Sequence, residues 1–152
     1  MIYQYPTTKP YRISSKYGYR THPVTGVKGS FHNGVDLACP IGTILKNTVT
    51  QGKCTKVGYD GRNGNYLRIK HDNGLITSYA HLSTVIVKQG ATVDVGEVFA
   101  TTGNTGLGTG AHVHFRVQKL DGATYSNVNP EDYFSFDANL IGDLDPKREK
   151  RV

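Results

Sequence analysis

The segment TGAHVHFRV (109–117) places two histidines two residues apart in a run that alternates apolar and polar residues. Successive side chains of a β-strand point to opposite faces, so we expect His112 and His114 on one face and Val113 and Phe115 on the other. At about 6–7 Å between Cα atoms, one imidazole could bind a metal ion while the other contacts a water on that ion. Two histidines exposed on a strand surface would fit the same pattern, so other residues must decide.

Two further segments contain side chains that bind metals. HNGVD places His32 four residues before Asp36, and both can point the same way if Asn33 and Gly34 form a turn or a bulge. Taken alone, this aspartate is equally well explained as a turn cap. YAHL places His81 at the end of an expected strand, where a histidine without a ligand is the simpler interpretation.

Together the three segments favour a catalytic metal site. Two histidines and one carboxylate would give Zn²⁺ three protein ligands and leave its fourth position to water. The two remaining imidazoles could then act as base and acid around that water, because histidine titrates near neutrality. The HExxH motif of helical metalloproteases, with its glutamate base, does not occur. The five candidates are His32, Asp36, His81, His112 and His114.

The elements that must position these residues are short strands. Turn signals such as CPIG, YDGRNGN and HDNG divide the chain into runs of strand length. HDNG (71–74) predicts a β-hairpin turn, and PEDYF (130–134) predicts a single helical turn that begins with proline. The pattern predicts a mainly β fold, a single domain of antiparallel sheets. The expected strands are 48–56, 65–70, 75–81, 98–102 and 111–120.

A length of 152 residues is sufficient for one domain with its own core. We expect residues 15–136 to form this domain and residues 1–14 to be an N-terminal extension that packs on the sheet. The last residues, 137–152, are highly charged and are expected to form a tail or a linker.

The net charge of +6 favours an acidic partner, such as an anionic cell wall, an anionic membrane or a nucleic acid. Lysine and arginine are scattered except in KREKR (147–151), which disfavours a nucleic acid. No apolar run approaches the ~20 residues of a membrane span, and the first residues do not form a signal peptide. We therefore expect no membrane insertion, and delivery by an upstream region, a virion or a lysis pore if the protein acts outside a cytoplasm.

Cys39 and Cys54 match no metal-binding spacing such as CxxC. Two interpretations stay open at this point. The cysteines are small buried hydrophobic residues, or they form a disulfide between neighbouring strands.

The combination of HNGVD, YAHL and TGAHVHF, in this order, resembles the lysostaphin/LytM type of zinc peptidoglycan endopeptidase. RTHPVTG, IKHDNGLITSYAHLS, VDVGEVFATTGNTGLGTG and VNPEDYF extend the resemblance from about residue 15 to residue 134. The departures are Cys39, where many relatives carry an apolar residue or proline, and LKNTVTQG, which replaces a small apolar stretch. Neither departure affects the five candidate residues.

The resemblance implies one Zn²⁺ per chain, held by His32, Asp36 and His114. It implies that His81 and His112 polarise the metal-bound water and stabilise the tetrahedral intermediate. It also implies the lysostaphin-type fold, with a narrow groove between loops that correspond to residues 17–31, 59–65, 82–88 and 104–110.

Two other histidines, His22 and His71, fall in similar segments outside the motif and are expected to be structural or surface residues. The implied substrates are stem peptides or cross-bridges of bacterial peptidoglycan, with anionic wall polymers attracted by charge. We expect a monomer or a part of a larger protein at the cell wall or on a virion, such as a phage lysin. The alternatives are an inactive pseudoenzyme of the same fold and a virion component whose metal only stabilises it.

Overall fold

The structure is a computed structural model that describes residues 2–7, 12–20, 26, 29–106 and 110–136. Residues 137–152, expected to form a tail, and His22 lie outside these ranges. Among the described residues, no helix has the length and apolar character needed to cross a membrane. The elements are β1 (Tyr3–Gln4), β2 (Arg12–Ser15), β3 (Gly18–Arg20), β4 (Ser30–His32), β5 (Val35–Ala38), β6 (Ile44–Lys46), β7 (Gly52–Asp60), β8 (Gly64–His71), β9 (Leu75–Val85), β10 (Thr92–Val93), β11 (Val98–Thr102), β12 (His112–Asp121), β13 (Thr124–Val128), the 3-10 helix η1 (Pro130–Asp132) and β14 (Phe134–Ser135).

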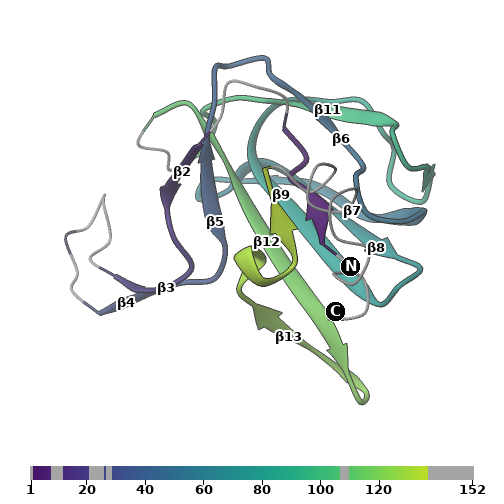
Figure 1. Cartoon of the computed structure of the whole chain (residues 1–152). Coiled ribbons are helices and arrows are strands. Elements are labelled where there is room, and N and C mark those ends of the chain that lie inside the picture. The colour runs from purple at the N-terminus through teal and green to yellow at the C-terminus, as the bar shows by residue number, and fades with distance from the viewer. Residues whose placement is uncertain (1, 8–11, 21–25, 27–28, 107–109, 137–152) are drawn as a thin grey trace.

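One large antiparallel sheet organises the described chain, which confirms the mainly β prediction. Its strand order is β10-β7-β8-β9-β12-β5-β2, while β13 extends beside β12 and β11 joins β9 to β6. In Figure 1 the long strand β12 runs through the middle of the molecule, with β5 and β13 along it. The hairpin β3–β4 projects to one side of this sheet, and β1 pairs with β14 in parallel.

The expected strands exist: β11 has the predicted ends, and the other four are shifted at one end or both. The strand predicted from residue 48 begins only at Gly52, because the buried Asn47 side chain forms a turn there. Its Nδ2 donates to the carbonyl of Thr50 at 2.9 Å and its Oδ1 accepts from the Val49 N–H at 3.1 Å. The predicted helical turn is η1, capped by the side chain of Asn129. The hairpin at 71–74 joins β8 to β9 as predicted.

The apolar face of β12 forms the centre of the core. Val113, Phe115 and Val117 are fully buried, as the alternation of this strand predicts. The Phe115 ring contacts those of Tyr79 at 5.4 Å and Phe134 at 4.9 Å between centroids. The alternate residues of β12 therefore lie on the opposite face of the sheet, where the histidines are.

Cys39 and Cys54 are both buried and both free. Burial raises the pKa of each thiol, and hydrogen bonds offset this effect only in part. The disulfide interpretation was therefore wrong, and the two residues pack as small hydrophobic side chains.

His71 is a buried structural residue, as expected. Its Nδ1–H donates to the Thr50 carbonyl at 2.8 Å, and its Nε2 accepts from the Thr77 hydroxyl at 2.7 Å. Thr77 in turn accepts from the Tyr79 hydroxyl at 2.8 Å. Since both ring nitrogens are used by the neutral form, a proton on Nε2 would break this chain of hydrogen bonds.

Acid should therefore destabilise the fold through His71. Burial lowers the pKa of His71 in the folded protein, so the unfolded chain binds the proton more tightly. The contribution of His71 to stability is complete above its unfolded pKa of about 6.5 and is lost as the pH falls below it, by at most about 1.4 kcal/mol per pH unit. Urea unfolding at pH 7.5 and pH 5.0 should show a smaller loss for His71→Gln than for the wild type. Equal losses in both proteins would contradict this.

Candidate metal centre

Strand pairing brings Asp36 and His114 together. Strands β5 and β12 are antiparallel, and their register places His114 directly opposite Asp36 and Val113 opposite Leu37. Residues opposite each other share a face, so the carboxylate and the imidazole both point away from the apolar core. Sequence alternation in the two strands, which are 78 residues apart at this pair, thus produces one polar site.

His32 reaches the same site from the end of β4. The chain turns at Asn33 and Gly34 before it enters β5. At Gly34 it passes so close to β12 that a Cβ would lie 2.3 Å from the Phe115 carbonyl oxygen. A residue without a side chain is therefore required for His32 and Asp36 to face the same point.

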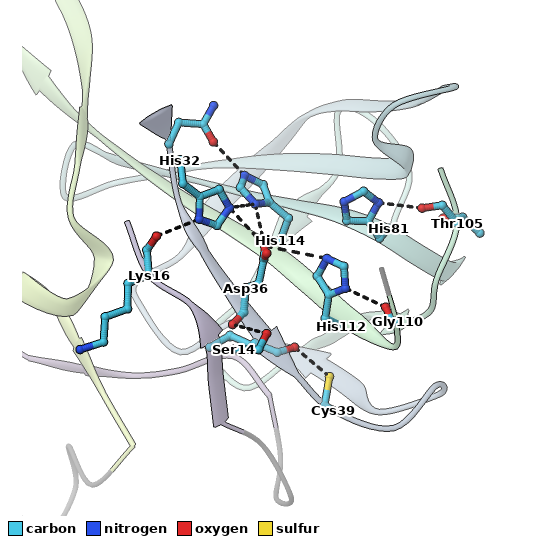
Figure 2. Close-up of polar contacts among 12 residues, drawn as sticks. Ser14, Lys16, His32, Asp36, Cys39, His81, Thr105, Gly110, His112 and His114 are labelled. Carbon is cyan, nitrogen blue, oxygen red and sulfur yellow. Dashed lines mark hydrogen bonds and ion pairs between the residues drawn. The ribbon is translucent and has the colours of Figure 1, made fainter. Parts of the chain in front are cut away.

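Three ligand atoms converge in this site (Figure 2). His114 Nδ1 lies 3.0 Å from His32 Nε2 and 3.0 Å from Asp36 Oδ1, and His32 Nε2 lies 3.3 Å from the same oxygen. His32, Asp36 and His114 are the group of potential metal ligands found among the described residues. Bonds of about 2.0–2.1 Å to a tetrahedral zinc would place ligand atoms about 3.3 Å apart, so these spacings fit Zn²⁺.

The outer hydrogen bonds of the two rings fix which nitrogen faces the site. His32 Nδ1–H donates to the Lys16 carbonyl at 3.0 Å, and His114 Nε2–H donates to Asn33 Oδ1 at 2.8 Å. Each neutral ring therefore directs a lone pair inward, towards a carboxylate oxygen, with no proton between them. Such a set of acceptors is stabilised by a cation, and outer-shell partners of this kind orient metal ligands.

Electrostatics keep this set ready for a cation. Burial alone would raise the pKa of the Asp36 carboxyl, but the close contacts with the His114 and His32 imidazoles hold it well below its usual range. Burial lowers the pKa of His114, partly offset by Asp36. The site therefore combines an ionised carboxylate with a neutral imidazole at neutral pH.

His112 and His81 lie beside the three ligands, with ring centroids 4.9 Å apart. His112 Nδ1–H donates to the Gly110 carbonyl and His81 Nδ1–H to the Thr105 carbonyl, both at 2.7 Å. Among the described residues neither Nε2 atom forms a hydrogen bond, and that of His112 lies 3.8 Å from Asp36 Oδ1. Burial lowers the pKa of His81, with the Thr105 hydrogen bond opposing this.

A β-bulge directs His81 into the site. Between the pairs Tyr79–Leu67 and Leu82–Asn65, β9 has one residue more than β8, and His81 takes a φ of 64°. Simple alternation would place His81 on the same face as the buried Tyr79. The left-handed conformation costs of order 1–3 kcal/mol and is held by the His81 N–H, which donates to the Asn63 carbonyl at 2.7 Å.

Three of the expected groove loops, 59–65, 82–88 and 104–110, meet beside His81. Thr105 Oγ1 accepts from the Asn65 N–H at 3.1 Å and donates to the Leu82 carbonyl at 2.7 Å. A Cβ on Gly64 would lie 2.3 Å from Thr105 Oγ1. Residues 21–25, 27–28 and 107–109 of the expected groove walls lie outside the described residues.

The structure thus brings all five predicted residues together and adds supporting groups that the sequence did not reveal. Asn33 orients His114. The sequence offered a signal for this residue, because Asn33 is a polar side chain inside HNGVD, directly after the predicted ligand His32. The backbone carbonyls of Lys16, Thr105 and Gly110 orient the other rings. Carbonyl groups leave no trace in the residue types, so no sequence signal could have identified them.

Gly34→Ala should disturb the site by steric contact. Its Cβ would force β5 away from the Phe115 carbonyl, at a cost of at least about 1–3 kcal/mol, typical of overpacking. We expect a lower urea midpoint and weaker zinc binding. Gly61→Ala is the matched control, because a Cβ there would meet nothing within 4 Å. Equal urea midpoints and equal zinc affinities for the two variants would show that the close approach of Gly34 to Phe115 is not needed for the site.

Comparison with known proteins gives a consistent result. The sequence model of peptidase family M23 matches residues 30–130. The peptidoglycan DD-endopeptidase ShyA of Vibrio cholerae is 40% identical over 115 residues, which are 75% of this chain and 26% of that protein. The first relatives found are matched over only 24% to 30% of their own length.

Two solved structures show the same fold. A zinc-containing peptidase from Vibrio cholerae is 36% identical with a TM-score of 0.72, over 86% of this chain and 39% of that chain. The catalytic domain of lysostaphin from Staphylococcus simulans is 30% identical with a TM-score of 0.65, over 77% of this chain and 88% of that one. The expected lysostaphin-type architecture is therefore confirmed.

Proposed function

This chain belongs to peptidase family M23, and on that premise we propose that it is a zinc-dependent endopeptidase that hydrolyses peptide bonds in bacterial peptidoglycan. The observation that carries the proposal is the convergence of His32 Nε2, Asp36 Oδ1 and His114 Nδ1 within 3.3 Å of one another. Two further imidazoles with open Nε2 atoms lie beside them. We assign His32, Asp36 and His114 as the metal ligands, with one zinc per chain.

We assign His112 and His81 as the catalytic residues. A zinc ion in this site would supply a Lewis acid that lowers the pKa of water and polarises the scissile carbonyl. Because both rings keep their proton on Nδ1, each Nε2 is free to accept the proton of the attacking water. The protonated ring can then donate to the leaving amine nitrogen, and in the same form it stabilises the negative oxygen of the tetrahedral intermediate.

The proposed substrate class rests on the relatives. ShyA is named as a peptidoglycan DD-endopeptidase, and lysostaphin as an antimicrobial peptidase. The net charge of +6 would also speed encounter with anionic wall polymers, an effect that fades with salt. The bonds we propose are those of stem peptides or cross-bridges.

We further propose the biological setting. The protein acts at the bacterial cell wall, as a phage or tail-associated lysin or as one part of a larger protein, and it works as a monomer. Its enzymatic unit spans residues 15–136, with 1–14 as an extension packed on the sheet and 137–152 as a tail or linker.

Digestion of purified peptidoglycan tests the activity. The protein is incubated with sacculi with zinc, with a chelator, and with zinc restored after chelation, and released fragments are identified by mass spectrometry. We expect new amino termini only in the two zinc-containing samples. The masses of the fragments identify the scissile bond.

The alternatives give different results. A pseudoenzyme would bind peptide and zinc but release no fragment in any sample. A virion component whose metal only stabilises the fold would release no fragment in any sample and would unfold when zinc is removed, which circular dichroism of the chelated sample detects. Either result would overturn the proposed function.

A further inference from the structure

A row of polar side chains crosses the sheet next to the metal centre. The register pairs Arg116 of β12 with Ser78 of β9 and pairs Ser78 with Arg68 of β8. The preceding row contains His114 opposite Ala80. Since side chains two residues apart share a face, this arginine row lies on the face of the metal ligands, about 7 Å along the strand.

The two arginines have no acidic partner among the described residues. The ion pairs found there all involve Asp36 and histidines. Arg116 and Arg68 are both partly buried, and Arg116 Nε donates to Asn127 Oδ1 at 2.7 Å. Arg68 Nε and Ser78 Oγ are buried without a hydrogen-bond partner.

Two neighbouring guanidinium groups together with unpaired buried donors lower the stability of the fold unless an anion binds between them. Two like charges repel, and buried donors without partners cost about 1–3 kcal/mol each. A carboxylate would remove both costs, because a guanidinium binds it through two parallel N–H···O bonds. The row therefore has the properties of an anion-binding site built into the sheet surface.

We propose that Arg116 and Arg68 bind a free carboxylate of the substrate peptide and so select acidic peptides for cleavage. The inference rests on the proposed function and deepens it. An extended peptide advances about 3.4 Å per residue, so the acidic group would lie about two residues from the bond at the metal centre. The arginines are specificity-determining residues and not catalytic ones.

Matched peptide pairs test this inference. Each pair shares one sequence and differs only in a carboxylate or a carboxamide two residues from the scissile bond, with one pair for each side of that bond. For one of the pairs we expect the wild type to show a kcat/KM about 10- to 100-fold higher for the acid, the range of a charged hydrogen bond. Arg116→Gln and Arg68→Gln should remove this preference, while cleavage of the carboxamide changes little.

Two control variants separate specificity from folding. Lys119→Gln removes one positive charge from the same strand, but Lys119 points to the opposite face and is exposed, so this variant should keep the preference. Arg116→Lys keeps the positive charge but loses the two parallel N–H donors of the guanidinium, so it should retain part of the preference for the acid. Equal kcat/KM for acid and carboxamide in the wild type, or equal losses for both in the arginine variants, would overturn the inference.

Binding measurements keep this inference distinct from the proposed function. The zinc-loaded His112→Ala variant is titrated with both peptides by calorimetry. Tighter binding of the acid that depends on Arg116, without hydrolysis by the wild type, would support the anion site and contradict the endopeptidase. Hydrolysis by the wild type with no preference for the acid would support the endopeptidase and contradict the anion site. Arg116-dependent binding of a phosphodiester polymer with no preference between the peptides would also overturn the inference.

Discussion

His112→Ala is expected to keep zinc and to lose nearly all hydrolysis. Its Nε2 lies 3.8 Å from Asp36 Oδ1, whereas His114 Nδ1 lies 3.0 Å from that oxygen and from His32 Nε2. His112 is thus beside the ligand set and free to transfer protons. General acid–base catalysis contributes about 10²–10⁴-fold, so kcat should fall by that factor. Elemental analysis measures the zinc, and fragment release from sacculi measures the turnover.

A histidine outside the site is the matched control. His71→Gln also removes one imidazole, but within the described ranges the His71 ring bonds to Thr50 and Thr77 and to no residue of the site, so at pH 7.5 its turnover should stay close to that of the wild type. Loss of zinc from His112→Ala would instead make His112 a ligand. Full turnover with zinc retained would assign proton transfer to another group.

Strand periodicity made much of this site predictable. The alternation of apolar and polar residues in 111–120 places Val113 and Phe115 in the core, so His112 and His114 had to face the other side. The same rule applies to Asp36, which is flanked by the fully buried Val35 and Leu37. Where a strand is regular, residue types are enough to determine the direction of a side chain.

The sequence was less informative where the backbone departs from a regular strand. His81 enters the site through a bulge and a positive φ, whereas alternation alone would have placed it on the core face. The contacts that hold it come from Asn63 and Thr105, in loops distant in sequence. Asn47 likewise delays β7 by a side-chain turn. The contacts of His81 are tertiary hydrogen bonds, which no local pattern encodes, whereas the Asn47 turn is formed by bonds to residues two and three positions away.

Asp36→Asn is expected to abolish zinc binding. The carboxylate is the only charged ligand of the three, and its contacts with the two imidazoles lower its pKa despite the opposing effect of burial, so it is held ionised. The carboxamide introduced by Asp36→Asn has the same size but no charge, so it would place either a neutral oxygen or an NH₂ group next to the lone pairs of His32 Nε2 and His114 Nδ1. Outer-shell changes typically cost about 10–100-fold in metal affinity, and loss of a ligand should cost more. Zinc per chain by elemental analysis and zinc affinity by competition with a chelator measure the effect.

A second measurement distinguishes loss of zinc from loss of the fold. A ligand that binds only the native state raises stability with its concentration, so zinc should raise the Tm of the wild type but not that of Asp36→Asn. Asp121→Asn, at the exposed end of β12, is the control and should respond to zinc like the wild type. If Asp36→Asn bound one zinc with unchanged affinity, the ion would be held elsewhere. The assignment of Asp36, His32 and His114 as its ligands would then be wrong.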